Sequence, residues 1–246
     1  METETEKEIY LSVIIPAYNE EKRIGPTLKT IDKFLRNKNY SYEIIVVEAG
    51  SSDKTAELVQ NYTKSIPNLR FMKAQSGIFK GNKVKEGMLA AKGKYRLFTD
   101  ADNATPIEEA EKLLPFFNQG YEVVIGSRAV DRALIKVHQP FYREFLGRAG
   151  NVLIQLLAVP GIKDTQCGFK CFTAKAAQDI FSRLTIMGWG FDIEVLALAN
   201  LKKYRIKEVP VVWINDPNST VSAGAYFTTL RELFKIKFNL ITKKYG

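Results

Sequence analysis

Short runs of β-branched and aromatic residues alternate with helix-length stretches through the first half of the chain. We expect strands at Leu11–Ile15, Glu43–Val47, Leu69–Lys73, Tyr95–Thr99 and Glu122–Ile125. We expect helices between them at Asn19–Lys38, Asp53–Lys64, Gly81–Lys92 and Pro106–Asn118. Regular alternation of this kind predicts an α/β fold with a mostly parallel sheet and helices on both faces. Ligands of such sheets bind at the carboxyl ends of the strands.

The second half of the chain has a different pattern. Helices are expected at Phe141–Val159 and Trp189–Lys203, and a strand at Ile206–Trp213. The last stretch, Tyr226–Lys244, is basic, and its apolar residues recur at spacings of three and four, which is typical of an amphipathic helix. We therefore expect one α/β domain over residues 9–214, followed by a basic amphipathic segment over residues 215–246.

Charge and composition narrow the choice of partner. The 246 residues carry a net charge of +9, which attracts nucleic acid, anionic lipid headgroups or phosphorylated substrates without choosing among them. No apolar run approaches the roughly 20 residues of a membrane-spanning helix. A zinc site needs about four ligands, which two cysteines, Cys167 and Cys171, and one histidine do not supply.

Two aspartates stand directly after the predicted strand Tyr95–Thr99. Asp100 and Asp102 are separated by one residue, so in extended backbone their side chains point to the same side. Carboxylate oxygens are the ligands that Mg²⁺ and Mn²⁺ prefer, and such a cation can bridge a diphosphate. Taken alone, the triplet is more typical of an ordinary acidic turn. Glu48 and Gly126 also fall at or just past predicted strand ends, which favours a ligand site at this edge.

Several motifs follow one another in a characteristic order. They are Ile14-Ile15-Pro16-Ala17-Tyr18-Asn19-Glu20, Glu48-Ala49-Gly50-Ser51, Asp100-Ala101-Asp102, Gly126-Ser127-Arg128 and Asp164-Thr165-Gln166-Cys167-Gly168-Phe169-Lys170. In this order, over roughly Leu11 to Trp213, the chain resembles the GT-A glycosyltransferases that move a sugar from a nucleotide onto dolichyl or polyprenyl phosphate. The heptapeptide, together with Trp189-Gly190-Phe191-Asp192-Ile193-Glu194, looks closest to the dolichyl-phosphate β-glucosyltransferase branch. Mannose synthases more often show a Ser-Gly-Phe variant.

The resemblance implies a donor site with a bound Mg²⁺ or Mn²⁺ on Asp100 and Asp102. The residues expected at the nucleotide sugar are Pro16, Ala17, Tyr18, Glu20, Glu48, Gly50, Lys80, Asp100, Ala101, Asp102, Gln166 and Asp192. The family usually has Asp at the position of Ala49, so its contact with the base does not carry over there. Lys80 is expected at the phosphates, while Lys83 and Lys85 fit a solvated basic helix face. A charge that favours the start of a helix is the alternative role for Asp192.

The resemblance also implies an acceptor site. Arg128 and Arg143 match the arginines that grip the acceptor phosphate, and Arg148 and Asn151 lie further along the same predicted helix. The guanidinium fork suits this task because it binds phosphate oxygens in pairs. The expected catalytic set is Asp100, Asp102, Arg128, Arg143 and Asp164. The second pKa of a phosphate monoester lies near 6, so the acceptor is mostly dianionic at neutral pH and needs no general base.

These features predict an inverting, metal-dependent glycosyltransferase at the cytoplasmic face of a membrane. UDP-glucose is the first expected donor and GDP-mannose the second, with dolichyl or polyprenyl phosphate as acceptor. We expect a peripheral attachment to the membrane surface and no nucleic-acid partner. A helix packed on the domain, or pairing with a membrane partner subunit, is the alternative role of the last segment.

Two other protein classes remain as alternatives. A sugar-nucleotide pyrophosphorylase would need a glycine-rich loop with a basic residue after the first strand, where this chain has Pro16-Ala17-Tyr18-Asn19. A non-catalytic basic module that binds nucleic acid or membrane would give Asp100 and Asp102 no role.

Overall fold

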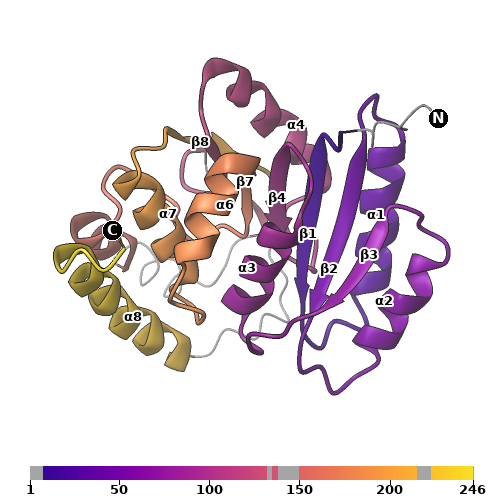
Figure 1. Cartoon of the computed structure of the whole chain (residues 1–246), viewed down its shortest axis with the longest axis horizontal. Helices are drawn as coiled ribbons and strands as arrows, with labels where there is room; N and C mark the ends of the chain where they lie inside the picture. The colour runs from indigo at the N-terminus through magenta and orange to yellow at the C-terminus, as the bar shows by residue number, and fades with distance from the viewer. Residues whose placement is uncertain (1–7, 132–134, 138–149, 215–222, 246) are drawn as a thin grey trace, which may run out of the picture.

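A seven-stranded sheet forms the centre of the molecule. The computed structural model describes residues 8–131, 135–137, 150–214 and 223–245. The strands of the sheet are β1 (Leu11–Ala17), β2 (Tyr42–Glu48), β3 (Leu69–Lys73), β4 (Tyr95–Thr99), β5 (Val123–Ser127), β7 (Phe169–Thr173) and β8 (Ile206–Pro210). Their spatial order is β3-β2-β1-β4-β7-β5-β8 (Figure 1). All pairs are parallel except those of β7, which is antiparallel to β4 and β5. The predicted mostly parallel sheet is confirmed.

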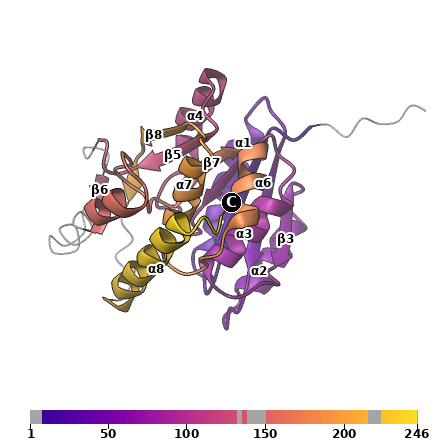
Figure 2. The ribbon, with the colours of Figure 1, turned by 60° about the vertical axis from the view of Figure 1, so that its left-hand side comes forward.

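Helices cover both faces of this sheet. They are α1 (Ile24–Arg36), α2 (Thr55–Thr63), α3 (Lys80–Ala90), α4 (Ala110–Leu113), α6 (Ala174–Arg183), α7 (Phe191–Leu201) and α8 (Ala223–Ile241). Residues 150–157 are also helical. The pair α1 and α2 lies on one face, and α3, α6 and α7 lie on the other (Figures 1 and 2).

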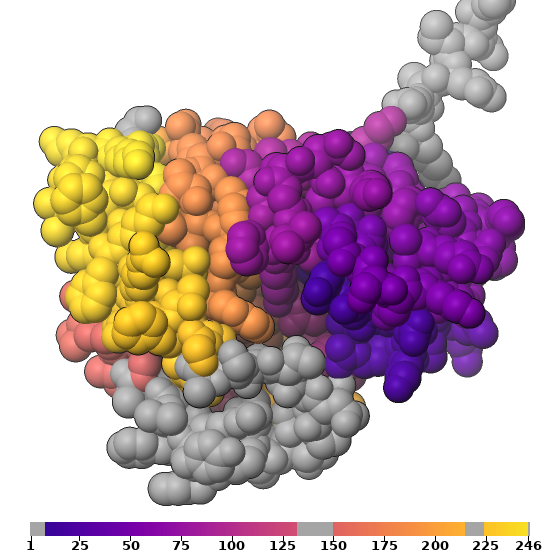
Figure 3. Space-filling view, turned by 90° about the horizontal axis from the view of Figure 1, so that it is seen from below, coloured from indigo at the N-terminus to yellow at the C-terminus, as the bar shows by residue number. Residues whose placement is uncertain are grey.

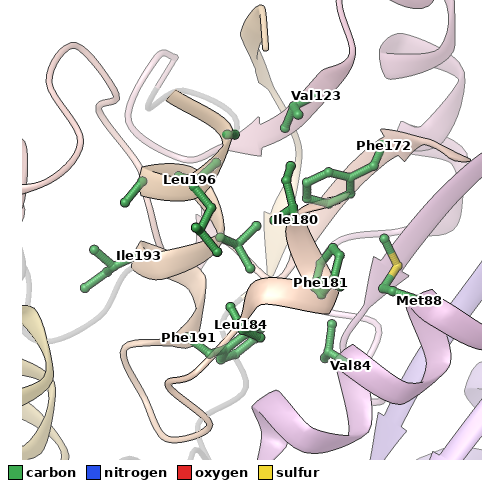
Figure 4. Packing of buried hydrophobic residues seen from close by; sticks show 14 of the residues in the cluster. Val84, Met88, Val123, Phe172, Ile180, Phe181, Leu184, Phe191, Ile193 and Leu196 are labelled. Carbon is green, nitrogen blue, oxygen red and sulfur yellow. The ribbon is translucent and has the colours of Figure 1, made fainter. Parts of the chain in front are cut away.

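The alternation of side chains along each strand divides the core into two clusters. On β1, Val13 and Ile15 face the α1 side, where Leu28 and Ile31 are buried. Ile14 faces the other side, together with Phe98 of β4 and the apolar residues of α3, α6 and α7. Figure 4 shows this second cluster, in which Val84 and Met88 of α3 lie near Phe181 of α6.

The segment predicted as one helix over Pro106–Asn118 is divided. It forms a 3-10 turn at Ile107–Glu109, the single turn α4, and a second 3-10 stretch at Leu114–Gln119. Proline occupies one of the first two positions of that second stretch. Pro115 has no N–H to donate to the preceding turn, so a continuous α-helix is interrupted here.

Three elements were not predicted, the strands β6 (Ile135–Val137) and β7 and the helix α6, and one predicted strand is divided. The strand β7 and the helix α6 follow the heptapeptide that sequence analysis treats as a binding motif. Thr173 ends the strand and caps α6, its hydroxyl accepting a hydrogen bond from the N–H of Ala176 at 3.2 Å. The strand predicted over Ile206–Trp213 divides into β8 and β9 (Trp213–Ile214), and β9 pairs with β6.

The carboxyl-terminal helix α8 has both a packed and an open face. Leu233 and Ile236 belong to the same core cluster as α6 and α7. In the ranges that the structure describes, no helix is long and apolar enough to cross a bilayer. The start of the helix predicted at Phe141–Val159 lies outside the described residues. The division of the chain at residue 214 also stays a prediction, because residues 215–222 are not described.

Candidate functional site

The loop after β4 carries the two aspartates predicted to bind metal. The hydroxyl of Thr27 on α1 holds this loop by donating to the Ala101 carbonyl at 2.8 Å. Asp102 accepts a hydrogen bond from the N–H of Ala104 at 3.0 Å. Burial, and then the neighbouring charge of Asp100, raise the pKa of Asp102 above its ordinary value. The two carboxylates therefore repel each other in a half-buried place.

Gly168 explains part of the Cys-Gly-Phe motif. Thr99 at the end of β4 pairs with Phe169 of β7, which brings Gly168 beside the Asp100 carboxylate. A Cβ atom at position 168 would lie 2.1 Å from Oδ2 of Asp100. Any larger residue would therefore displace Asp100.

Lys80, the first residue of α3, lies on the other side of Asp100. Its Nζ is 2.6 Å from Oδ1 of Asp100 and 5.7 Å from the centre of the Phe191 ring. Burial alone would lower the pKa of Lys80, but Asp100 and Asp192 outweigh it and hold the pKa above its ordinary value. The lysine predicted at the donor phosphates thus lies directly beside the metal motif.

The chemistry of this place fits a divalent cation. Asp100 and Asp102 offer carboxylate oxygens, and Lys80 contacts Asp100. Burial and the two carboxylate charges also raise the pKa of Glu20, against the opposing effect of Arg23, which pairs with Glu20 at 2.7 Å. Within the described ranges, no group of three or more His, Cys, Asp and Glu could hold a metal ion. The remaining ligands would come from a diphosphate and water.

A second part of the site lies between the loops after β1 and β2. Glu48 is buried, and its carboxylate accepts a hydrogen bond from the N–H of Ser51 at 2.8 Å. This bond stabilises the turn of the loop after β2. Gly50 has a φ of +74° and lies against Ile78 and Tyr18. The side chains of Tyr18 and Ile78 are 51% and 60% exposed, so they are accessible to a flat ligand.

The expectation that Lys83 is solvated is wrong. Lys83 is only 3% exposed. Its Nζ donates to the Ile78 carbonyl at 2.7 Å and lies 5.3 Å from the centre of the Tyr18 ring. Lys85 is also engaged, because its Nζ donates to the Leu184 carbonyl at 3.0 Å. Lysines are rarely buried without partners. The partners here are the Ile78 and Leu184 carbonyls, which cannot be identified from the apolar spacing of the helix.

Arg128 and Asp164 form a bidentate ion pair. Nε and Nη2 of Arg128 lie 2.7 and 2.8 Å from the two carboxylate oxygens, and the N–H of Arg128 donates to the same carboxylate at 2.9 Å. The guanidinium also lies over the Trp213 ring at 5.3 Å. Burial alone would raise the pKa of Asp164, but Arg128 outweighs it and lowers the pKa to about 2. Asp164 therefore orients Arg128 rather than lying free for a sugar hydroxyl.

This pair predicts a specific acid dependence of stability. The folded pKa of Asp164, about 2, is below the unfolded value of about 3.9. The ionised carboxylate thus stabilises the fold above about pH 4, and this contribution, about 2–3 kcal/mol, is lost as the pH falls through the folded pKa. Denaturation of the wild type and of Asp164→Asn should differ most at neutral pH and converge toward pH 2. A constant difference over this range would contradict the account.

Other predicted site residues are already engaged or lie outside the described ranges. The amide of Asn151 donates to the Lys163 carbonyl and accepts from the Thr165 hydroxyl. Gln166 donates to the Trp189 carbonyl at 3.4 Å. Arg143 and Arg148 fall outside the described residues. Burial alone would lower the pKa of Arg128, but the charges of Asp164 and, less strongly, Asp100 raise it, so the metal motif and Arg128 lie near each other.

Asp192 forms a buried ion pair that sequence analysis missed. Nζ of Lys170 lies 2.5 Å from Oδ1 of Asp192, and Lys170 is fully buried. Lys170 also lies 5.3 Å from the centre of the Phe98 ring. In the sequence, Lys170 lies between Phe169 and Phe172. These apolar neighbours were the one indication that this lysine points into the core. The Asp192 carboxylate, predicted at a sugar hydroxyl, is thus neutralised from within the protein.

The comparisons with known proteins agree with this geometry. The sequence model of glycosyl transferase family 2 matches residues 12–181. The dolichyl-phosphate beta-glucosyltransferase of Dictyostelium discoideum is 38% identical, over 95% of this chain and 75% of that protein. The enzyme of the same name from Homo sapiens is 35% identical, over 94% and 76%.

A solved structure shares the fold. It is the glucosyl-3-phosphoglycerate synthase from Mycobacterium tuberculosis in complex with Mn²⁺, uridine-diphosphate and phosphoglyceric acid. The TM-score is 0.70 at 17% identity, over 93% of this chain and 78% of that one. The paired carboxylates at the end of β4, the matched family model and the close relatives lead to one conclusion. The chain belongs to glycosyl transferase family 2.

Proposed function

We propose that this protein transfers glucose from UDP-glucose to dolichyl phosphate with inversion at the anomeric carbon. The observation that carries the proposal is the cluster of Asp100, Asp102 and Lys80 at the carboxyl end of β4. The relatives are named dolichyl-phosphate beta-glucosyltransferases, which supports glucose as the sugar and dolichyl phosphate as the acceptor. The synthase from Mycobacterium tuberculosis has also been solved with Mn²⁺ and UDP-glucose, which supports the choice of base and metal.

The chemistry needs few groups from the protein. A phosphate oxygen of the acceptor forms a bond to the anomeric carbon, while the bond from that carbon to the β-phosphate of UDP breaks and UDP leaves. Mg²⁺ or Mn²⁺ held by Asp100 and Asp102 would neutralise charge on the diphosphate. Lys80 would add a fixed positive charge beside the same leaving group.

Arg128 is the described residue best suited to orient the acceptor. Asp164 occupies Nε and Nη2 of its guanidinium and thereby fixes the plane of the fork. Nη1 projects from the other edge of the fork and would be the atom that contacts the acceptor phosphate. Arg143 and Arg148 remain predicted partners for the same phosphate. Because the acceptor is already ionised at neutral pH, positioning by such cations replaces a general base.

Thermal unfolding with ligands tests the donor side. UDP with Mn²⁺ should raise the melting temperature more than GDP with Mn²⁺, because only the preferred nucleotide binds tightly to the folded chain. At a ligand concentration a hundred times Kd the gain is about 2.7 kcal/mol, which corresponds to several degrees for a chain of this size. A larger rise with GDP would favour GDP-mannose. No rise with either would favour a non-catalytic basic module.

We also propose that α8 holds the enzyme, as a peripheral protein, on an anionic membrane surface at the cytoplasmic face. The apolar residues predicted to share one helix face are exposed: Phe227 by 75%, Leu230 by 38%, Phe234 by 56%, Phe238 by 65% and Ile241 by 68%. Phe227, Leu230, Arg231 and Phe234 line a shallow hollow. Figure 3 shows α8, in yellow, along one edge of the molecule.

Charge complementarity supports an anionic membrane surface as the occupant of this face. From residue 226 onward, five basic residues stand against one acid, Glu232; they are Arg231, Lys235, Lys237, Lys243 and Lys244. An apolar face with basic flanks is typical of a helix that lies in the membrane interface. Val152 and Leu156 are also exposed, on the helix of residues 150–157, which lies beside α8 in Figures 1 and 2. An acceptor with a lipid tail needs such an attachment.

Serine substitutions in this face should abolish membrane binding without unfolding the chain. Deleting α8 is the weaker test, because Leu233 and Ile236 are part of the core. The triple variant Phe227→Ser, Phe234→Ser and Phe238→Ser should lose binding to anionic phospholipid vesicles in sedimentation assays. Leu201→Ser, which changes an exposed apolar residue outside α8, is the control. If the triple variant bound vesicles like the wild type, another surface would be responsible.

A further inference from the structure

The only acid on α8 is joined to a loop of the body rather than to a basic neighbour on its own helix. Oε2 of Glu232 accepts a hydrogen bond from the N–H of Gly190 at 2.7 Å. A Cβ atom at Gly188 would lie 2.3 Å from Oε1 of Glu232, and one at Gly190 would lie 2.9 Å from its Cβ. Both glycines are therefore needed for the loop to approach Glu232 this closely.

The same loop is bonded to the donor site on its other side. The Met187 carbonyl accepts a hydrogen bond from the N–H of Gly81 at 3.0 Å, and Gly81 directly follows Lys80. A Cβ atom at Gly81 would lie 2.7 Å from the backbone of Met187, so the start of α3 and the loop are in direct contact. The Trp189 carbonyl accepts from Gln166. The loop of residues 187–190 thus connects α8 to the lysine that holds Asp100.

A second bond joins the carboxyl-terminal region to the body at a different place. The hydroxyl of Tyr245 donates to Oε1 of Glu194 at 2.5 Å. Glu194 in turn accepts from the N–H groups of Thr185 and Ile186, at 2.8 and 2.6 Å. Glu194 also donates its N–H to the Gly190 carbonyl at 3.1 Å. Removing the Tyr245 hydroxyl leaves this bond and those to residues 185 and 186 in place, so Tyr245→Phe provides a matched control.

We propose that Glu232 is a positioning residue for sugar transfer. Its carboxylate fixes the loop of residues 187–190, and the loop fixes the start of α3, where Lys80 contacts Asp100. The helix α8 is then a structural part of the donor site as well as a membrane attachment. The kinetic part of this inference rests on the proposed function, whereas the structural part does not.

Three variants separate this role from general loosening of α8. Glu232→Ala removes the acceptor for the Gly190 N–H, Glu232→Gln keeps an oxygen acceptor there, and Tyr245→Phe removes the other bond. Glu232→Ala and Tyr245→Phe should lower the melting temperature by similar amounts, because each loses one hydrogen bond to the body. Activity is measured without vesicles, on a short soluble acceptor, so that membrane attachment plays no part.

Glu232→Ala should lower kcat/KM for UDP-glucose about tenfold to a hundredfold, the range expected when a positioned group moves by about 1 Å. Glu232→Gln should restore most of this activity, and Tyr245→Phe should stay within about twofold of the wild type. Equal losses in Glu232→Ala and Tyr245→Phe would contradict a specific role for Glu232. Wild-type kinetics in Glu232→Ala would contradict it as well.

Hydrogen exchange provides a readout that does not depend on transfer activity. The amide of Gly81 should exchange faster in Glu232→Ala than in the wild type or Tyr245→Phe, because the loop that accepts its hydrogen bond is released. Unchanged exchange at Gly81 in Glu232→Ala would overturn the proposal. If the wild type transferred no glucose while the exchange pattern appeared as expected, the proposed function would fail, and the structural coupling from Glu232 to Gly81 would stand.

Discussion

Replacing Asp102 with Ala should lower kcat by about a thousandfold or more while the chain stays folded. The variant loses one of the two carboxylates proposed to hold the cation at the diphosphate, and electrostatic stabilisation of a leaving group is commonly worth this much. The folded structure disfavours the charge of Asp102, as its raised pKa shows. Removing that charge should therefore leave the melting temperature unchanged or slightly higher.

Two measurements make this prediction specific to the metal. Mn²⁺ should no longer add to the rise in melting temperature that UDP gives in Asp102→Ala. Glu57→Ala, which removes an exposed acid on α2, should behave like the wild type in both assays. Near-normal turnover of Asp102→Ala at saturating Mn²⁺ would show that the pair after β4 does not hold the cation.

Replacing Lys170 with Met should lower the free energy of unfolding by about 3–5 kcal/mol, because it leaves the buried carboxylate of Asp192 without its partner. Methionine fills a similar volume and allows contact with Phe98 to persist. Urea denaturation, followed by far-ultraviolet circular dichroism, measures the change.

The double variant Lys170→Met with Asp192→Asn distinguishes the lost charge pair from a packing defect. It removes both charges, and replacing both partners of a buried pair typically costs far less than removing one. Most of the stability should therefore return. A double variant as unstable as Lys170→Met, or a single variant as stable as the wild type, would contradict the buried ion pair as the cause.

The parallel part of the sheet could be predicted because its signals are local. In β1 and β2, runs of β-branched and aromatic residues precede helices of regular apolar spacing. The strands predicted there and at β4 agree with the structure within two residues at each end. Asp100 and Asp102 directly follow β4, so their position at a strand end followed from the strand itself.

The antiparallel strand β7 depends on distant partners. Phe169–Thr173 pairs with β4 and β5, both far away in the sequence, and its Lys170 obscures its apolar character. The burial of Lys170 becomes favourable only when Asp192 packs against it. The spacing of apolar residues predicts the helices and strands of this fold. Pairs of residues that are distant in the sequence, such as Lys170 and Asp192, depend on how those helices and strands pack together.

Several site contacts are also long-range. Arg128 and Asp164 are 36 positions apart, and in the structure Asp164, predicted as a catalytic residue, holds Arg128. The steric need for Gly168 appears only when Asp100 lies beside it. Glu232 offered one weak signal, as a single acid in a basic helix, and its partner Gly190 is 42 positions away.

The proposed transfer of glucose to dolichyl phosphate is tested most directly by identifying the product of one reaction. The chain is incubated with labelled UDP-glucose, Mn²⁺ and a short-chain dolichyl phosphate, and the lipid fraction is analysed for glucose and for the configuration of its anomeric carbon. We expect a β-linked glucosyl phosphate lipid, with one UDP released for each glucose transferred, and formation of this product about a thousandfold slower, or slower still, with Asp102→Ala. An α-linked product, or release of UDP without glucose on the lipid, would contradict the proposal.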